Sequence, residues 1–298
     1  MKYLMIKLFE IITLPAHPIP LHPKMVSSLL TVMTWNMWFD KTNRAQRTEI
    51  LLNEVISYNP DIVALQEVVP ESLKIIIAKM HPTYYIIGTI SPDIGYDTII
   101  LSKFPPIEWD RYYLPKTKMG RNLLLATLQT STRQITVGTF HLESVFLPKT
   151  KMAEDLKESQ LKYIYAISPL NSILMGDTNL PLPLSQRGIP LPLSQRGIPP
   201  NTEPISSPYI TDVYEEYTVS PPDSHSLGVC PFSKGAGAGA ATYCGHTNKH
   251  VKNKSIQSRL DRIYVKIKRN SLKVHFYGLT GTVTQPSDHF GVFTQLEF

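Results

Sequence analysis

The stretch TVMTWNMWFDKTNRAQRTEILLNEVISYNPDIVALQE, from Thr31 to Glu67, contains the pattern that decides the fold. It begins with a short β-prone run at residues 31–35, in which all side chains but Met33 are β-branched or aromatic. Helical spacing of apolar side chains follows at Ile50, Leu51, Val55 and Tyr58. Asn59-Pro60 ends this helix, and the apolar run after it predicts a buried strand over residues 62–66. Strand, helix and strand in succession predict a sheet that helices cover.

The same two patterns continue along the rest of the chain. β-prone runs follow at residues 84–88, 97–101, 123–129, 134–142, 172–175, 262–266, 273–277 and 291–296. An amphipathic helix between two of these strands is marked by Met152, Leu156, Tyr163 and Ile164. Many strands with a few interspersed helices predict an α/β (α+β) fold of stacked sheets with helices on their faces.

The composition is that of a folded globular protein, with 298 residues of which 42% are hydrophobic and 18% charged. No apolar run reaches the roughly 18 residues that a membrane span needs. Lys7 and Glu10 interrupt the apolar start of the chain, and no clean cleavage site follows, so a secretory signal is not expected. Cys230 and Cys244 form no CxxC pair, and we favour two unpaired thiols over a lone disulfide. We therefore expect an intracellular protein of the nucleus or cytoplasm that acts as a monomer and binds no membrane.

The formal net charge of +6 permits a polyanionic partner without requiring one. Two basic segments stand out, Lys249–Lys254 and Lys266–Arg269. Either they follow a nucleic-acid backbone or they form a solvated face, and the sequence does not decide between these interpretations.

Two segments differ in composition from their surroundings. Residues 181–198 contain the nonapeptide PLPLSQRGI twice without a change, and its prolines cannot donate the hydrogen bonds of a strand. Residues 235–241 alternate glycine and alanine and are expected to form a loop. We expect an N-terminal extension over residues 1–28, then one domain over residues 29–298 in which residues 181–200 are a proline-rich loop insertion.

Short polar motifs follow or precede the predicted strands. They are Thr34-Trp35-Asn36, Leu65-Gln66-Glu67, Phe140-His141-Leu142-Glu143, Gly176-Asp177-Thr178-Asn179, Arg259-Leu260-Asp261 and Ser287-Asp288-His289. Each motif alone is a weak signal, since Gly-Asp is most often turn chemistry and His beside Asp is most often a surface pair. Their common position at strand ends, where a rigid scaffold presents functional groups, favours one shared site.

In this order, the motifs resemble the signature of the endonuclease/exonuclease/phosphatase family. The resemblance implies a four-layer α/β/β/α sandwich with two packed mixed sheets and a phosphodiesterase site at one edge of the facing sheets. It also implies Mg²⁺ as the cofactor, which Mn²⁺ can replace, because hard cations prefer oxygen ligands. Glu67 is the expected metal ligand with the Asn36 amide oxygen beside it, and Asp288 is either a second ligand or an orienting group.

The family resemblance further implies a role for each remaining motif residue. Asp177 would position and deprotonate the attacking water, and Asn179 would fix Asp177 and the phosphate. His289, as an imidazolium held by Asp261, would stabilise negative charge on the phosphoryl oxygens. Substrate contacts are expected from Arg121, His141 and Ser144. Trp38 and Tyr243 either stack on a base or pack in the core.

A narrower resemblance is to the tyrosyl-DNA phosphodiesterases within this family. It rests on the segments Met119–Leu124, His141–Ser144, Gly176–Leu180, Thr211–Tyr214 and Arg259–Ile263. It implies a DNA end with a 5′ tyrosyl or protein adduct as the substrate, as in the repair of topoisomerase adducts. Pro181 stands where those enzymes have an arginine near the phosphate, and Thr242-Tyr243-Cys244 stands where they have Thr-Trp-Asp. The alternatives are another DNA or RNA phosphodiesterase, such as an abasic-site endonuclease or an exonuclease, and a non-catalytic nucleic-acid-binding relative.

Overall fold

The computed structural model describes residues 29–144, 151–180, 209–219, 241–267 and 272–297. In this part of the chain the strands form two six-stranded sheets and one two-stranded sheet. The first sheet has the order β13 (Lys273–Thr280), β14 (Gly291–Glu297), β1 (Leu29–Asn36), β2 (Ile62–Val68), β4 (Asp97–Ser102) and β3 (Tyr85–Ile87). The second has the order β5 (Pro106–Tyr113), β6 (Asn122–Gln129), β7 (Gln134–His141), β8 (Ser172–Asp177), β12 (Asp261–Ile267) and β9 (Tyr209–Asp212). The short sheet pairs β10 (Tyr243–Cys244) with β11 (Gln257–Ser258).

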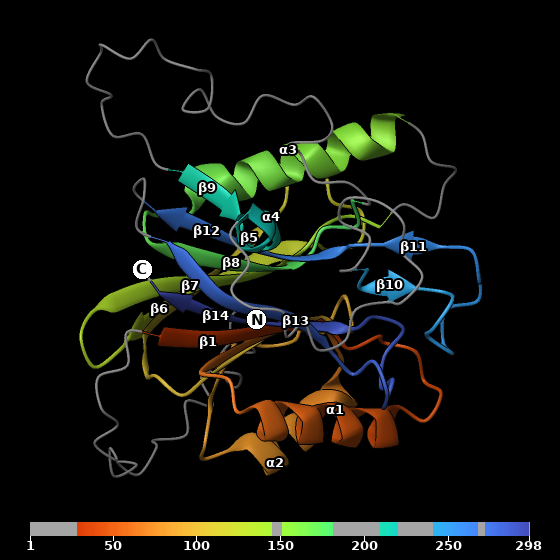
Figure 1. Ribbon diagram of the computed structural model, residues 1–298. Helices are drawn as coiled ribbons and strands as arrows, with labels where there is room; N and C mark the ends of the chain where they lie inside the picture. The colour runs from red at the N-terminus through yellow and green to blue at the C-terminus, as the bar shows by residue number, and fades with distance from the viewer. Residues whose placement is uncertain (1–28, 145–150, 181–208, 220–240, 268–271, 298) are drawn as a thin grey trace, which may run out of the picture.

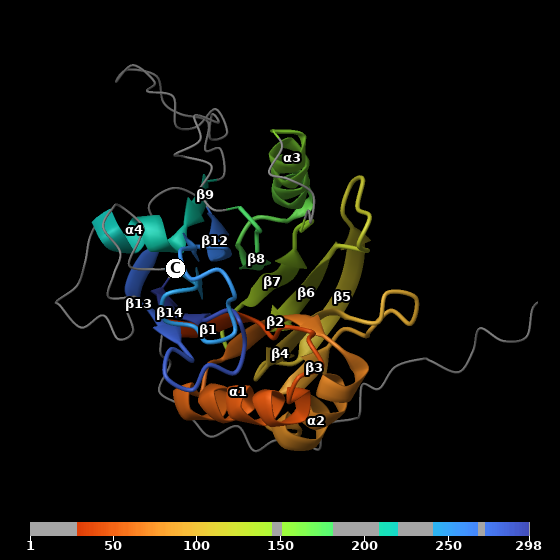
Figure 2. The same ribbon diagram turned by 90° about the vertical axis from the view of Figure 1, so that its right-hand side faces the viewer.

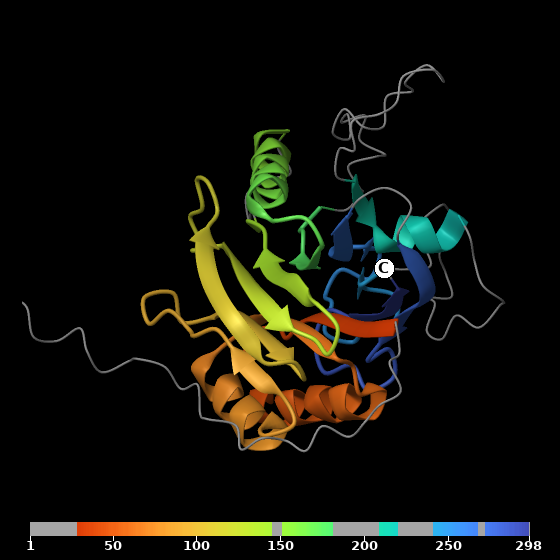
Figure 3. The same ribbon diagram turned by 90° about the vertical axis from the view of Figure 1, so that its left-hand side faces the viewer.

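Three helices lie on the outer faces of the two stacked sheets (Figure 1). Figures 2 and 3 show from both sides that α1 (Arg44–Tyr58) and α2 (Pro70–Met80) cover the first sheet, while α3 (Lys151–Ile167) covers the second. The short α4 (Val213–Val219) packs against β13 and β12. The order helix, sheet, sheet, helix confirms the predicted four-layer sandwich with two mixed sheets.

Alternation along the strands divides the interior into three cores. In β1, Val32 faces the second sheet, whereas Met33 and Trp35 face α1 and α2. In the second sheet, Phe140 and Leu174 face α3. Each fully buried side chain of this size stabilises the fold by about 1.5–3 kcal/mol. A shift of one residue in register would move the apolar side chains of a strand to its opposite face. The three cores therefore fix the strand registers.

These registers bring the polar motifs to one edge of the sandwich. Parallel pairing of β1 with β2 sets Asn36 opposite Gln66, and parallel pairing of β7 with β8 sets His141 opposite Asp177. Antiparallel pairing of β12 with β8 then sets Asp261 opposite Asp177. The strand ends that carry the motifs are therefore neighbours in space.

Several elements escaped prediction from the sequence, namely α2, β5, β9, α4, β10 and β11. The run Ile75-Ile76-Ile77 in α2 is β-branched, and its helical state is set by packing on the first sheet and α1. β5 is an edge strand exposed along most of its length, so it lacks the alternation that marks a half-buried strand.

Some sequence predictions fall outside the described residues. These are the extension over residues 1–28, the repeat insertion over residues 181–200, the glycine–alanine run up to residue 240, and Cys230 with its pairing. Cys244 itself is buried. No helix among the described residues has the length and apolar character to cross a membrane.

Candidate active site

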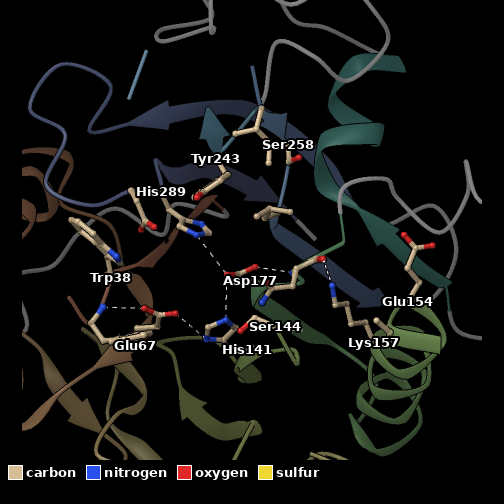
Figure 4. A pocket seen from close by; sticks show the side chains of 16 residues that line it. Trp38, Glu67, His141, Ser144, Glu154, Lys157, Asp177, Tyr243, Ser258 and His289 are labelled. Atoms are coloured by element: carbon tan, nitrogen blue, oxygen red, sulfur yellow. Dashed lines mark hydrogen bonds and ion pairs between the residues drawn. The ribbon is translucent and has the colours of Figure 1, made fainter. Parts of the chain in front are cut away.

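A cavity of about 400 Å³ opens at the edge where the motifs meet (Figure 4). Its walls come from strand ends of both large sheets, from the start of α3 and from the small β10–β11 sheet. It is lined by Trp38, Phe39, Glu67, His141, Ser144, Ala153, Glu154, Lys157, Asp177, Asn179, Tyr243, Ile256, Ser258, Leu260, Asp288 and His289. Three of the expected site residues, Asn36, Arg121 and Asp261, are buried directly behind this lining.

Asp177 lies at the centre of the site, at the end of β8. Its Oδ2 atom accepts a hydrogen bond from Asn36 Nδ2 at 3.1 Å, and its Oδ1 atom accepts one from the Asn179 backbone at 2.8 Å. Two imidazoles flank the same Oδ2 atom, with His141 Nε2 at 3.3 Å and His289 Nε2 at 3.8 Å. Burial alone would raise the pKa of Asp177, but His141, His289 and the Asn179 amide together hold it well below its ordinary value. The carboxylate is therefore ionised at neutral pH.

Gly176 permits this convergence. A Cβ atom at this position would lie 1.9 Å from the Phe140 carbonyl oxygen, so only glycine allows β7 and β8 to approach where His141 and Asp177 pair. The glycine of the Gly-Asp motif thus serves close strand packing, and no positive φ angle is needed there.

His289 is held between two carboxylates. Its Nδ1 atom lies 2.7 Å from Asp261 Oδ2, and its Nε2 atom faces Asp177. Burial alone would lower the pKa of His289, but the charges of Asp261 and Asp177 raise it well above the usual histidine range. This direction favours the imidazolium form of His289 at neutral pH. Trp35 Nε1 donates to the His289 carbonyl at 3.0 Å and ties this loop to β1.

His141 meets a different partner on its far side. Arg121 Nη1 lies 2.5 Å from His141 Nδ1, and Arg121 Nη2 donates to Ser144 Oγ at 2.8 Å. Arg121 is buried behind His141 and does not line the cavity, whereas Ser144 and His141 do. Arg121 therefore does not reach the cavity itself, but it holds two residues that line it, His141 and Ser144.

Glu67 lies on the cavity wall, at the end of β2, in a left-handed backbone conformation with φ of 59°. Its Oε2 atom accepts the Phe39 backbone N–H at 2.9 Å, and its Oε1 atom is 3.9 Å from His141 Nδ1. Asn36 is beside it, but its amide oxygen accepts the Trp38 N–H at 2.9 Å while its amide nitrogen faces Asp177. Non-glycine residues take such conformations at a cost that surrounding contacts must offset, often at functional sites.

Asp288 completes a set of carboxylates that face one another. Burial raises the pKa of Asp288 to about 6. The charge of His289 lowers this pKa, whereas the charges of Glu67, Asp177 and Asp261 raise it. The Oδ1 atom of Asp261 is buried and has no hydrogen-bond partner among the described residues. Crowded carboxylates such as Glu67, Asp177 and Asp288, which all line the cavity, suit a hard divalent cation, which binds oxygen donors.

One tight cluster of ligand-type atoms is found among the described residues. It joins Asp177, Asp261 and His289, whose atoms lie within 4.8 Å of one another. The hydrogen bond from His289 to Asp261 accounts for most of this closeness. Glu67 and Asp288 are the carboxylates that line the cavity beside it.

Sequence reasoning missed the contribution of α3. Lys157 Nζ donates to the Asn179 carbonyl at 2.9 Å, and Lys157, Glu154 and Ala153 line the cavity. The Asn179 side chain donates to the Leu142 carbonyl at 3.1 Å, so Asn179 reaches Asp177 through its backbone N–H. The apolar pattern predicted the helix, but of its four marking residues only Ile164 is buried and Met152 is exposed, so the pattern gave the wrong face at the start of α3. No motif marks the polar residues there.

The two aromatic candidates both lie at the cavity. Trp38 has Arg47 over its ring at 4.5 Å and His250 beside it at 4.9 Å between ring centroids. The Tyr243 ring lies 5.1 Å from that of His289. Both rings thus line the cavity and do not pack in the hydrophobic core.

The two basic segments have different positions. Lys249, Lys252 and Lys254 are exposed on the loop between β10 and β11, the two strands that carry the cavity-lining residues Tyr243 and Ser258. Lys266 Nζ instead donates to the Tyr165 and Ser168 carbonyls at the C-terminal end of α3, at 2.8 and 2.6 Å. Lys268 and Arg269 fall outside the described residues.

Comparison with known proteins gives a consistent picture. Residues 33–289 match the Endonuclease/Exonuclease/phosphatase family. The chain is 33% identical to tyrosyl-DNA phosphodiesterase 2 of Rattus norvegicus over 158 residues, which is 52% of this chain and 42% of the relative. It is 31% identical to the Homo sapiens protein of that name over 157 residues, covering 51% of this chain and 42% of the relative. The matched region thus spans about two fifths of the length of these relatives.

Solved structures share the fold over nearly the whole chain. The structure of D. rerio TDP2 complexed with single strand DNA product has a TM-score of 0.67 and 24% identity, and covers 91% of this chain and all of that one. Truncated Caenorhabditis elegans TDP2 has a TM-score of 0.66 at 21% identity, with 91% and 98% coverage. An endonuclease/exonuclease/phosphatase from Bacteroides vulgatus has a TM-score of 0.64 at 16% identity, with 91% and 100% coverage.

Proposed function

The chain belongs to the endonuclease/exonuclease/phosphatase family, and on this premise we propose that it is a metal-dependent phosphodiesterase that hydrolyses 5′-phosphotyrosyl adducts on DNA ends. The observation that carries the proposal is the position of Asp177, an ionised carboxylate between two imidazoles at a cavity rich in carboxylates. Water activation and stabilisation of an anionic transition state need this combination of groups.

In the proposed reaction, Asp177 accepts a proton from the attacking water. Asn36 Nδ2 and the Asn179 N–H each donate to this carboxylate and fix its plane. His289 faces the same cavity as an imidazolium and donates to the non-bridging phosphoryl oxygens as the charge on them grows. Asp261 holds the ring of His289 through Nδ1 and keeps the Nε2 atom directed at the substrate.

Glu67 and Asp288 would hold Mg²⁺, with the Asn36 amide oxygen next to Glu67, and Mn²⁺ would substitute for it. Such a cation supplies Lewis-acid charge that neutralises the phosphate and the departing oxygen. The crowding of Asp288 by other carboxylates supports a cation here.

The substrate assignment rests on the relatives. The curated relatives reported above are tyrosyl-DNA phosphodiesterases, and one structure that shares the fold holds a single strand DNA product. A DNA end fits a protein of net charge +6 with exposed lysines beside its cavity. Ser144, Trp38 and Tyr243 line the cavity where the substrate would bind, and Arg121 and His141 would support it from one side. We propose with this substrate a DNA-repair role in the nucleus or cytoplasm, performed by a monomer.

A side-by-side turnover assay tests the proposal with 5′-tyrosyl DNA, abasic-site DNA and single-stranded RNA, each with Mg²⁺ and with a chelator. We expect the tyrosyl end to be cleaved far faster than the other two, and chelation to abolish cleavage until Mg²⁺ or Mn²⁺ is restored. Faster cleavage of abasic DNA or RNA would move the chain to the alternative substrates. Absence of turnover on all three, with DNA binding retained, would favour a non-catalytic relative.

A further inference from the structure

The two histidines that flank Asp177 have opposite partners on their far nitrogens. His289 Nδ1 meets the carboxylate of Asp261, while His141 Nδ1 meets the guanidinium of Arg121. An arginine can only donate hydrogen bonds. His141 Nδ1 must therefore carry the lone pair, and the ring proton lies on Nε2, from which it points at Asp177 Oδ2 at 3.3 Å. Arg121 thus selects the tautomer of His141 that donates to Asp177.

Arg121 is itself fixed by the turn that precedes it. Its backbone N–H donates to Thr117 Oγ1 at 2.7 Å, and the Thr117 hydroxyl donates to Glu143 Oε2 at 2.8 Å. The same Glu143 oxygen accepts the Lys118 N–H at 3.1 Å. Glu143 therefore holds the turn between β5 and β6 from which the arginine extends.

Glu143 is in turn attached to α3. Its backbone N–H donates to Gln160 Oε1 at 3.0 Å, and Gln160 Nε2 donates to the Pro115 carbonyl in the same turn at 3.1 Å. Both side chains are buried, Gln160 completely. A continuous chain of hydrogen bonds thus runs from α3 through Glu143, Thr117 and Arg121 to His141, whose Nε2 atom lies 3.3 Å from Asp177 Oδ2.

We propose that Glu143 is a positioning residue, which acts through Thr117 and Arg121 on His141. It holds His141 in the tautomer and the position in which Nε2–H points at the Asp177 carboxylate. The proposal deepens the proposed function, because it concerns the same carboxylate that accepts the proton from water. Loss of Glu143 frees the turn, Arg121 samples other positions, and His141 is no longer held to one tautomer. The effect falls on the rate of turnover and leaves substrate binding almost intact, because Glu143 does not line the cavity.

The chain offers a matched control at the opposite end of the sandwich. Asp61 Oδ2 accepts both the hydroxyl and the backbone N–H of Thr31, at 2.7 and 2.9 Å, as Glu143 Oε2 accepts a hydroxyl and a backbone N–H. Thr31 lies near the start of β1, whereas the site lies at the end of that strand. Asp61→Ala therefore removes the same kind of interaction without touching the site.

The kinetic test compares Glu143→Ala, Glu143→Gln and Asp61→Ala. We expect Glu143→Ala to lower kcat about tenfold with KM changed less than about twofold, the effect of one lost hydrogen-bonded link. Glu143→Gln retains an acceptor oxygen and should keep most of the rate. Asp61→Ala should lower Tm and leave kcat unchanged.

If Glu143→Ala fails to fold, Thr117→Val removes the same hydrogen bond, and Thr117→Ser, which keeps the hydroxyl, should restore the rate. An unchanged kcat in Glu143→Ala or Thr117→Val, or an equal loss in Asp61→Ala, overturns the proposal.

Two further measurements separate this proposal from the proposed function. In the Arg121→Ala background, Glu143→Ala should cause no additional loss of kcat, because a residue that acts through Arg121 has nothing left to position. The imidazole ¹⁵N spectrum of His141, assigned with His141→Gln, reports the tautomer without any substrate. A single Nε2–H tautomer in the wild type that becomes a mixture in Glu143→Ala supports the positioning role, even if the true substrate is not a tyrosyl adduct. A His141 spectrum that is identical in the two proteins overturns it.

Discussion

Asp177 illustrates how one side chain acquires a chemical role from its neighbours. A buried carboxylate is ordinarily driven toward its neutral form, yet here its pKa lies well below the usual range because two imidazoles and a backbone amide face it. The neighbours that lower the pKa also fix the carboxylate plane. Ionisation and orientation therefore have the same cause, which is the convergence of strand ends.

The first prediction concerns Asp177 and His289. Asp177→Asn should lower kcat by about two to four orders of magnitude, because an amide cannot accept the proton from water. His289→Ala should lower kcat by about two to three orders, as the loss of a preorganised donor does. Circular dichroism would establish that both variants fold. Retention of more than about a tenth of the wild-type rate by either variant would remove that residue from its assigned role.

The second prediction concerns Lys157, which brings positive charge to a cavity wall that also carries Glu67, Asp177 and Asp288. A phosphate in this cavity needs a cationic contact, and Lys157 Nζ is already held at the Asn179 carbonyl. Lys157→Met should raise KM by about ten- to a hundredfold with a smaller change in kcat, the usual effect of losing a charged hydrogen bond. Lys157→Arg should recover much of the affinity.

Lys266→Met is the control for Lys157, since Lys266 also donates to backbone carbonyls of the α3 region but at the far end of the helix. Tm should fall in this control while KM stays at the wild-type value. An equal rise of KM in both variants would show that Lys157 acts through the stability of α3 and not through the substrate.

For single residues, the sequence predicts which side chains gather at the site, but it predicts less well which atoms each of them contacts there. Asp177, His289 and Asp261 follow from motif order because strand registers force strand ends together. The burial of Arg121 behind His141 depends on a turn held by Glu143, which no local pattern encodes. Lys157 enters the site only because α3 packs across the second sheet, so its role is a product of tertiary structure.

Among the elements, the small β10–β11 sheet links the basic loop to the catalytic edge. Asn248 Nδ2 donates to the Ser287 carbonyl at 2.9 Å, and His250 Nε2 lies 2.9 Å from the Gln285 carbonyl. Ser287 precedes Asp288 and His289 directly. The loop that carries the exposed lysines is thereby held to the segment that carries Asp288 and His289.

The third prediction tests this loop as a contact for the DNA backbone. The double variant Lys249→Glu, Lys252→Glu should weaken DNA binding, and the slope of log K against log salt should become less steep by about one to two units. The control Lys74→Glu, Lys273→Glu makes the same change of net charge at exposed positions on α2 and β13. Equal effects of the two double variants would mean that the overall charge, and not this loop, governs binding.

The helices and strands could be predicted from the sequence only in part. Strands with a buried face, such as β1 and β7, leave alternating or continuous apolar patterns. β5 leaves no such pattern, and the residues of β9 and α4 are too few to establish a period. Elements whose structure depends on a neighbouring strand or helix are beyond what local sequence encodes.

For the molecule as a whole, a buried ion network joins the edge of the second sheet to its centre. Asp212 at the end of β9 accepts Arg259 Nη1 and Nη2 at 2.9 and 2.8 Å, and Arg262 Nη1 at 3.1 Å. Arg262 Nη2 also donates to the Leu180 carbonyl at 3.1 Å, just beyond the Asp177 motif. The network thus fixes β9 on β12 and the chain that leaves β8.

The last prediction follows from the charge of Asp212. Burial alone would raise its pKa, but Arg259 and Arg262 lower it below the ordinary value. A carboxyl whose folded-state pKa is lowered stabilises the fold above its unfolded pKa of about 3.9, and this stabilisation is lost as pH falls through the folded-state value. Asp212→Asn should therefore lower the free energy of unfolding by about 3–5 kcal/mol at neutral pH, since it leaves the buried Arg262 without its carboxylate partner and Arg259 with only Glu215, at 3.9 Å. The difference between wild type and variant should shrink as pH falls below about 3.9. Urea unfolding of both proteins across this range measures it, and a difference that stays constant down to the acid limit would show that the carboxylate charge contributes nothing.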